Sequence, residues 1–103
     1  MGNEAGIKLD QGKPRAGLMI NDFGLALKKI SEVTTFGADK YTPSGWCHVE
    51  NAKERYFDAG MRHLLENGSL PIDEESNLEQ LPMVVWNLLA VIELQEREKR
   101  GLA

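Results

Sequence analysis

The feature that most constrains the fold is an apolar run, residues 83–94, in a chain of only 103 residues. Asn87 and Glu93 interrupt the run, and it falls well short of the roughly 20 residues that cross a bilayer. Because it is apolar nearly all round a helix, it predicts a central buried helix or one in a subunit interface. The remaining residues must fold around it as one domain, residues 1–103, since this length leaves no room for a second.

Two other segments carry apolar residues at helical spacing. The first predicts a helix from Asn21 or Asp22 to about residue 37. The second predicts a helix from Asn51 to Glu66, with a stop signal at residues 67–68. Before them, residues 1–21 hold several glycines and no sustained period, so we expect an irregular arm there.

The start of the last helix has two conflicting signals. Residues 76–79 match the capping box, in which Ser and Glu satisfy each other's backbone donors, and this predicts a helix from there to about Arg100. Pro82 follows six residues after the cap, so either the helix kinks there or its regular part begins there. The acidic residues 73–75 would complement the dipole of this helix.

The elements together predict an all-α fold, a small bundle of three main helices and an irregular N-terminal arm. No segment shows the alternation of a strand, and residues 41–45 combine Pro and Gly as in a loop. Three helices of this size bury a modest core, and the last one offers more apolar surface than the other two can cover. We therefore expect a homo-oligomer.

Composition and charge exclude several functions. With 12 Lys and Arg against 16 Asp and Glu, the net charge of −4 opposes binding to duplex nucleic acid. The single cysteine, Cys47, forms no zinc motif, and adjacent side chains in an extended loop point apart, which argues against a nucleophilic pair with His48. Without an apolar leader or a bilayer-length run, we expect a cytoplasmic protein that does not bind membranes.

Several polar residues on the predicted helices have two interpretations. Arg55, Asp58, Arg62 and Glu66 follow one helix stripe, which is either a salt-bridged solvent face or part of a site. Asn87, an amide within an apolar run, is either a site residue or an interhelical hydrogen-bonding group.

Two further features are weak by themselves. A lone histidine beside leucines, such as His63, is more often a hydrogen-bonded core residue than a ligand. In the arm, Lys13 and Arg15 flank a proline after Gly12, and flexible backbone with such charges can wrap a phosphate.

Several short motifs follow one another along the chain in the same order as in a known protein family. The chain resembles the phage dATP/dGTP diphosphohydrolase N-terminal domain family, a MazZ-like group among the all-α, MazG-type nucleoside triphosphate pyrophosphohydrolases. The resemblance covers nearly the whole chain. The motifs that carry it are residues 10–15, 35–41, Trp46, 55–56, Ala59, 62–64, Asp73, 75–76 and Asn87.

The resemblance implies an oligomeric bundle that holds Mg²⁺ or Mn²⁺ and cuts a nucleotide between its α- and β-phosphates, releasing pyrophosphate. The catalytic residues it implies are Glu75, Arg62 and His63. The substrate-binding residues are Lys13, Arg15, Lys40, Trp46, Arg55 and Asn87. The metal ligands are Glu75, Glu79 and Asp58.

The chain also departs from the family pattern. Two histidines that usually open the last helix of the family are replaced by Gln80 and Met83. Paired ExxE and ExxD ligand motifs of typical MazG enzymes are absent as well. The resemblance therefore leaves two hypotheses. The first is an active pyrophosphohydrolase of a (deoxy)nucleoside triphosphate. The second is an inactive relative that sequesters nucleotides, including signalling nucleotides, or binds a host protein.

Overall fold

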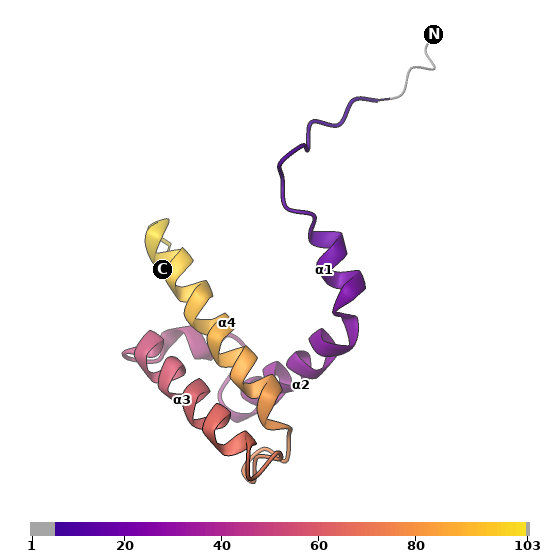
Figure 1. Ribbon diagram of the computed structural model, residues 1–103. Coiled ribbons are helices and arrows are strands. Elements are labelled where there is room, and N and C mark those ends of the chain that lie inside the picture. Colours follow the sequence, from indigo (N-terminus) through magenta and orange to yellow (C-terminus); the bar gives the residue numbers. More distant parts are fainter. Residues whose placement is uncertain (1–5, 103) are drawn as a thin grey trace.

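The computed structural model describes residues 6–102, and this part of the chain is all-α, as predicted (Figure 1). None of its helices is long and apolar enough to cross a membrane. The described helices, in order, are α1 (Ala16–Asp22), α2 (Gly24–Lys40), the 3-10 helix η1 (Gly45–His48), α3 (Ala52–Asn67) and α4 (Gln80–Lys99).

Helices α3 and α4 run antiparallel and form the centre of the bundle, and α2 packs against α4 (Figure 1). The close approach of α3 and α4 depends on Gly60, which is buried. A Cβ added at Gly60 would lie 3.2 Å from the Cβ of Asn87, tighter than ordinary van der Waals contact. A larger residue at Gly60 would therefore force the two helices apart.

The prediction of an irregular arm over residues 1–21 is wrong for residues 16–21, which belong to α1. Good helix formers such as Leu18 and Met19 outweigh the single glycine in this stretch. The predicted helix from Asn21 or Asp22 accordingly begins later, at Gly24, and extends beyond residue 37 to Lys40. Residues 1–5 of the predicted arm lie outside the described part.

The α3–α4 connection corrects the predicted capping box. The Ser76 hydroxyl donates to Asp73 Oδ2 at 2.8 Å and accepts from the Leu78 N–H at 3.2 Å, so Ser76 ties the loop and caps no helix. Asn77 adopts a left-handed φ of 61°, which interrupts helical backbone and which Asn tolerates better than most residues.

The late start of α4 also resolves the conflict at Pro82. Because α4 begins at Gln80, Pro82 lies in the first turn, where a backbone N–H has no intrahelical partner. The proline therefore removes no helical hydrogen bond and starts no kink. The acidic residues 73–75 lie in the loop, separated from the helix start.

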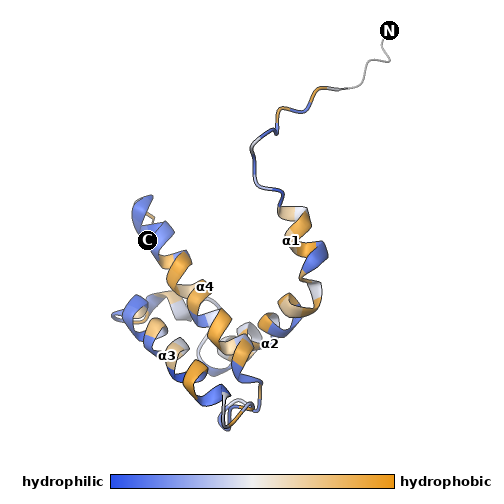
Figure 2. Ribbon diagram, in the orientation of Figure 1, coloured by the Kyte–Doolittle hydropathy of each residue, from blue (hydrophilic) through white to orange (hydrophobic). Residues whose placement is uncertain are grey.

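Helix α4 is buried on one side only, so the alternative of a central helix buried all round is wrong, and the alternative of a helix in a subunit interface stays a prediction. Met83, Val84 and Ala90 are buried, and the exposed apolar residues on the helix are Leu81, Val85, Leu88, Leu89 and Ile92. Helix α1 extends away from the bundle, and Figure 2 colours parts of it as hydrophobic. It has no buried residue, and its Leu18, Met19 and Ile20 are exposed. Two apolar surfaces are therefore left without cover.

Candidate functional site

A cavity of about 870 Å³ lies where α2, α3, α4 and the segment around η1 meet. The structure places most of the predicted site residues around it. Those lining it are Lys40, Trp46, Arg55, Asp58, Arg62, His63, Glu75 and Asn87. Glu79, at the start of α4, and Lys13 and Arg15, before α1, are not among the lining residues.

The arginines of the α3 stripe face this cavity. Arg55 and Arg62 are two helical turns apart on one face, and Asp58 lies between them. Within residues 6–102, neither guanidinium forms an ion pair, so the predicted salt bridges are absent there, although all four residues of the stripe are exposed to solvent as that interpretation expected. Two unpaired guanidinium groups lining one cavity can bind a phosphate through charge-assisted hydrogen bonds.

Three aromatic rings form one end of the cavity. Trp46, Tyr56 and Trp86 contact one another edge to face, with ring centroids 5.5–6.1 Å apart. The Tyr56 hydroxyl donates to the Trp46 carbonyl at 2.6 Å, and burial raises the pKa of the Tyr56 phenol, so it remains a donor. Such rings offer an apolar surface to a nucleobase.

Lys40 and Glu75 form an ion pair at the rim of the cavity. The hydrogen bond to Glu75 raises the pKa of Lys40, so the ammonium keeps its charge throughout the neutral range. The pair ties the end of α2 to the loop before α4. Because of this ion pair, the negative charge of the Glu75 carboxylate is already balanced by the Lys40 ammonium.

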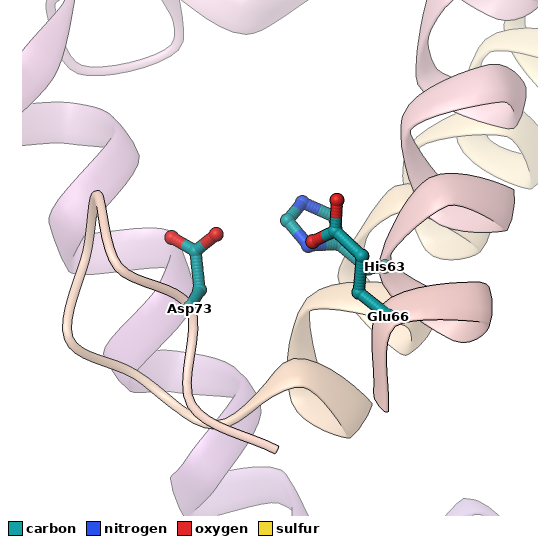
Figure 3. A group of neighbouring side chains, drawn as sticks. All are labelled: His63, Glu66 and Asp73. Carbon is teal, nitrogen blue, oxygen red and sulfur yellow. The ribbon is translucent and has the colours of Figure 1, made fainter. Parts of the chain in front are cut away.

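A second group of polar side chains lies where α3 meets the following loop. His63 and Glu66 on α3 and Asp73 on the loop point toward a common space (Figure 3). One ligand atom from each lies within 4.8 Å of the other two. An imidazole nitrogen and two carboxylates at this spacing can hold a divalent cation.

Gln80 forms hydrogen bonds to two of these three residues, His63 and Glu66. Its side chain is fully buried, its Oε1 lies 2.6 Å from His63 Nδ1, and its Nε2 donates to Glu66 Oε2 at 3.4 Å. His63 is thus a hydrogen-bonded residue, as the simpler interpretation expected, but it also lines the cavity.

The side-chain amide N–H of Asn87 finds its hydrogen-bond partner within α4. Its Nδ2 donates to the Met83 carbonyl one turn earlier at 2.8 Å, so the interhelical hydrogen bond considered from the sequence is not the one formed. The residue is 6% exposed and lines the cavity. Its side-chain oxygen therefore stays available to a ligand.

Sequence reasoning missed three contributors to the site. Tyr56 and Trp86 line the cavity although the sequence assigns neither of them a binding role, and Glu66 is predicted only as part of a charged stripe. The spacing of His63 and Glu66, three residues apart on one helix face, was the signal that could have paired them.

The comparisons with known proteins give one match. The family model described as dATP/dGTP diphosphohydrolase, N-terminal, matches residues 3–101. No curated protein and no solved structure matches the chain. The family description indicates nucleotide pyrophosphohydrolase chemistry in coarse terms.

Proposed function

Because the chain belongs to the dATP/dGTP diphosphohydrolase N-terminal family, we propose that it is a phage-type (deoxy)nucleoside triphosphate pyrophosphohydrolase. The reaction cleaves the nucleotide between its α- and β-phosphates and releases a nucleoside monophosphate and pyrophosphate. One observation carries the proposal: Arg55 and Arg62, which have no carboxylate partner within residues 6–102, line the same cavity as His63 and Asp73, and these two residues with Glu66 can hold a metal.

The cavity has separate surfaces for the base and for the phosphates. Tyr56 and His63 are seven residues apart on α3, which corresponds to about 10 Å along the helix. In the proposed complex the base packs against the aromatic rings, and the phosphates extend toward Arg62 and the His63 end. Asn87, between these ends on α4, contacts the nucleoside through its amide oxygen.

The phosphate contacts come from cationic side chains around the cavity. Arg62 and Arg55 bind phosphate oxygens as planar forks, and Lys40 contributes a point charge at the rim. The arm of the same chain extends away from the bundle in Figure 1. Lys13 and Arg15 therefore reach phosphates in this proposal only from the arm of a second copy.

Hydrolysis needs a divalent cation, Mg²⁺ or Mn²⁺ in this proposal, which would neutralise phosphate charge and lower the pKa of a bound water. His63, Glu66 and Asp73 fit such an ion by donor type and spacing. The water oxygen forms a bond to the α-phosphorus, and the bond from that phosphorus to the bridging oxygen breaks. Glu75 or Asp58 accepts the water proton, and pyrophosphate leaves with the bridging oxygen.

A second function is favoured by two specific observations. Glu75, the proposed base, is paired with Lys40, and the positions of the two family histidines hold a buried Gln80 and a buried Met83. A chain with these features could bind nucleotides, including signalling nucleotides, without cutting them, or bind a host protein. The nucleotide-sequestering form of this alternative shares the phosphate-binding arginines with the hydrolase and differs from it only in turnover.

We also propose that the chain associates with a second copy. The exposed row Leu81, Val85, Leu89 and Ile92 continues along α4, and α1 leaves Leu18, Met19 and Ile20 about half exposed. Monomers rarely leave two such apolar surfaces to water. A solution mass of at least a dimer at micromolar concentration is expected, and a monomeric mass would remove this part of the proposal.

A nucleotide panel tests the function directly. The purified protein is incubated with deoxynucleoside triphosphates in Mg²⁺ or Mn²⁺, and the products are separated by ion-exchange chromatography. The hydrolase yields monophosphate and pyrophosphate in equal amounts. Return of every nucleotide intact, together with measurable binding, would favour the sequestering alternative.

A further inference from the structure

We propose that His63, Glu66 and Asp73 form a site for one first-row transition-metal ion, and that Gln80 is its positioning residue. The ligand set differs from the carboxylates that the family resemblance implied, because it includes a nitrogen donor and Glu66. The inference rests on the proposed function only for the role of the ion in nucleotide hydrolysis. Binding of the ion itself follows from the geometry of this chain.

The spacing of the three side chains matches a small coordination sphere. Metal–ligand distances to nitrogen and oxygen are about 2.1 Å, so ligands on opposite sides of one ion are separated by about 4 Å. The ligand atoms of His63, Glu66 and Asp73 already lie within 4.8 Å of one another. Binding one ion therefore requires these separations to shorten by no more than about 1 Å.

Gln80 selects the tautomer of His63 that can bind a metal. A carboxylate only accepts hydrogen bonds, so the Gln80 amide nitrogen must face Glu66, which turns Oε1 toward His63. His63 Nδ1 therefore carries the hydrogen and donates it to Gln80. The lone pair then lies on Nε2, so the proposal requires the ion to bind His63 through this nitrogen.

The carboxylate of Asp73 is oriented in a similar way. Asp73 Oδ2 accepts from the backbone N–H and from the hydroxyl of Ser76, both at 2.8 Å. The two hydrogen bonds fix the plane of the carboxylate and leave Oδ1 for an ion. In protein metal sites, each metal ligand is commonly oriented by a hydrogen bond to a further group that does not touch the metal.

The donor set favours transition metals over Mg²⁺. Magnesium prefers oxygen ligands in near-ideal octahedral geometry and retains several waters. Imidazole nitrogen binds first-row transition metals more strongly, with affinity rising from Mn²⁺ to Co²⁺. A site with one imidazole and two carboxylates is therefore expected to bind Co²⁺ more tightly than Mn²⁺, and both more tightly than Mg²⁺.

Calorimetric titration without nucleotide tests the site. Wild-type protein is titrated with Co²⁺, Mn²⁺ and Mg²⁺, in parallel with Glu66→Gln and the matched control Glu74→Gln on the neighbouring loop. We expect one Co²⁺ per chain, at least ten-fold weaker binding of Mg²⁺, and at least ten-fold weaker Co²⁺ binding by Glu66→Gln. Glu66 is exposed, so this variant keeps its fold.

Two results would overturn the proposal: no saturable Co²⁺ binding by the wild type, or equal Co²⁺ affinity in Glu66→Gln and Glu74→Gln. Gln80 is tested with Gln80→Met, which keeps the length of the side chain and removes both hydrogen bonds. Its Co²⁺ affinity should fall 10–100-fold, and the visible absorption bands of the bound ion should shift. Unchanged bands and affinity would exclude a positioning role for Gln80.

The titration separates this inference from the proposed function. Tight Co²⁺ binding without pyrophosphate release in the nucleotide panel would overturn the hydrolase and keep the metal site. Pyrophosphate release by a protein whose Glu66→Gln variant binds Co²⁺ normally would overturn the site and keep the hydrolase.

Discussion

The two ends of the cavity are built in different ways. At the aromatic end, Trp46, Tyr56 and Trp86 pack against one another, and two of the three rings lie on α3 and α4. At the charged end, Arg62 and His63 meet a loop residue, Asp73. The side chains of the aromatic end also pack the helices against one another. The side chains of the charged end contribute little to helix packing. Changes at the aromatic end should therefore affect both stability and binding, and changes at the charged end mainly binding or turnover.

The largest expected effect concerns turnover at the charged end. Glu75→Gln keeps the size of the side chain and removes the carboxylate that we propose as the base. Turnover should fall at least 100-fold, in the range typical for loss of a general base. Nucleotide affinity should stay equal or rise slightly, because Lys40 loses its carboxylate partner.

Pyrophosphate release and nucleotide affinity, measured on the same preparations, check this prediction. The control is Glu74→Gln, which does not line the cavity. Full activity in Glu75→Gln would remove Glu75 from the catalytic assignment, and Asp58 would be the next carboxylate to test.

At the aromatic end, Trp86→Ala should lower the free energy of unfolding by about 3 kcal/mol, because the deletion leaves a cavity between Trp46 and Tyr56. Nucleotide affinity should fall as well. Urea unfolding monitored by circular dichroism gives the stability. A loss below about 1 kcal/mol would show that the ring contributes little to packing and would break the contrast between the two ends.

At the charged end, Arg62→Ala should weaken nucleotide binding and leave the free energy of unfolding nearly unchanged. Loss of a charge-assisted contact costs about 1.5–3 kcal/mol, so nucleotide binding should weaken ten-fold or more. The free energy of unfolding should stay within about 0.5 kcal/mol of the wild type, because Arg62 is exposed and forms no ion pair in the described part. Lys28→Ala, on α2 and away from the cavity, is the charge-matched control for the affinity measurement.

The smallest effect concerns pH and the Lys40–Glu75 pair. Since folding raises the pKa of Lys40, the pair contributes its stability fully below the unfolded pKa of 10.5 and loses it as the pH rises through the folded value. The melting temperatures of wild type and Lys40→Met should therefore differ by a constant amount from pH 7 to 9 and converge above pH 10.5. A gap that stays constant as the pH rises far beyond 10.5 would contradict this assignment.

The sequence predicted the elements that depend on local pattern. The apolar period of residues 51–66 and the run of residues 83–94 correspond to α3 and to the middle of α4. The start of α4 was misjudged because Ser76, the apparent cap, bonds to Asp73 within the loop. Helix α1 was missed because its few residues carry too little periodicity to outweigh the neighbouring glycines.

The site was predicted less completely, for a geometric reason. Arg55, Arg62 and His63 share one helix face, and a helical period is enough to group them. Glu66 and Asp73 meet only because the loop after α3 folds back, and no sequence spacing specifies that turn. From the sequence, Gln80 is only a replacement for a family histidine, and its place between His63 and Glu66 follows from the packing of α3 against the start of α4.

The central claim is that water attacks the α-phosphorus of a nucleotide in this cavity. Hydrolysis of dATP and dGTP in ¹⁸O-labelled water, followed by mass spectrometry of the products, tests it most directly. The account predicts one ¹⁸O atom in the nucleoside monophosphate and none in the pyrophosphate. Label in the pyrophosphate, release of inorganic phosphate, or recovery of unlabelled triphosphate alone would contradict it.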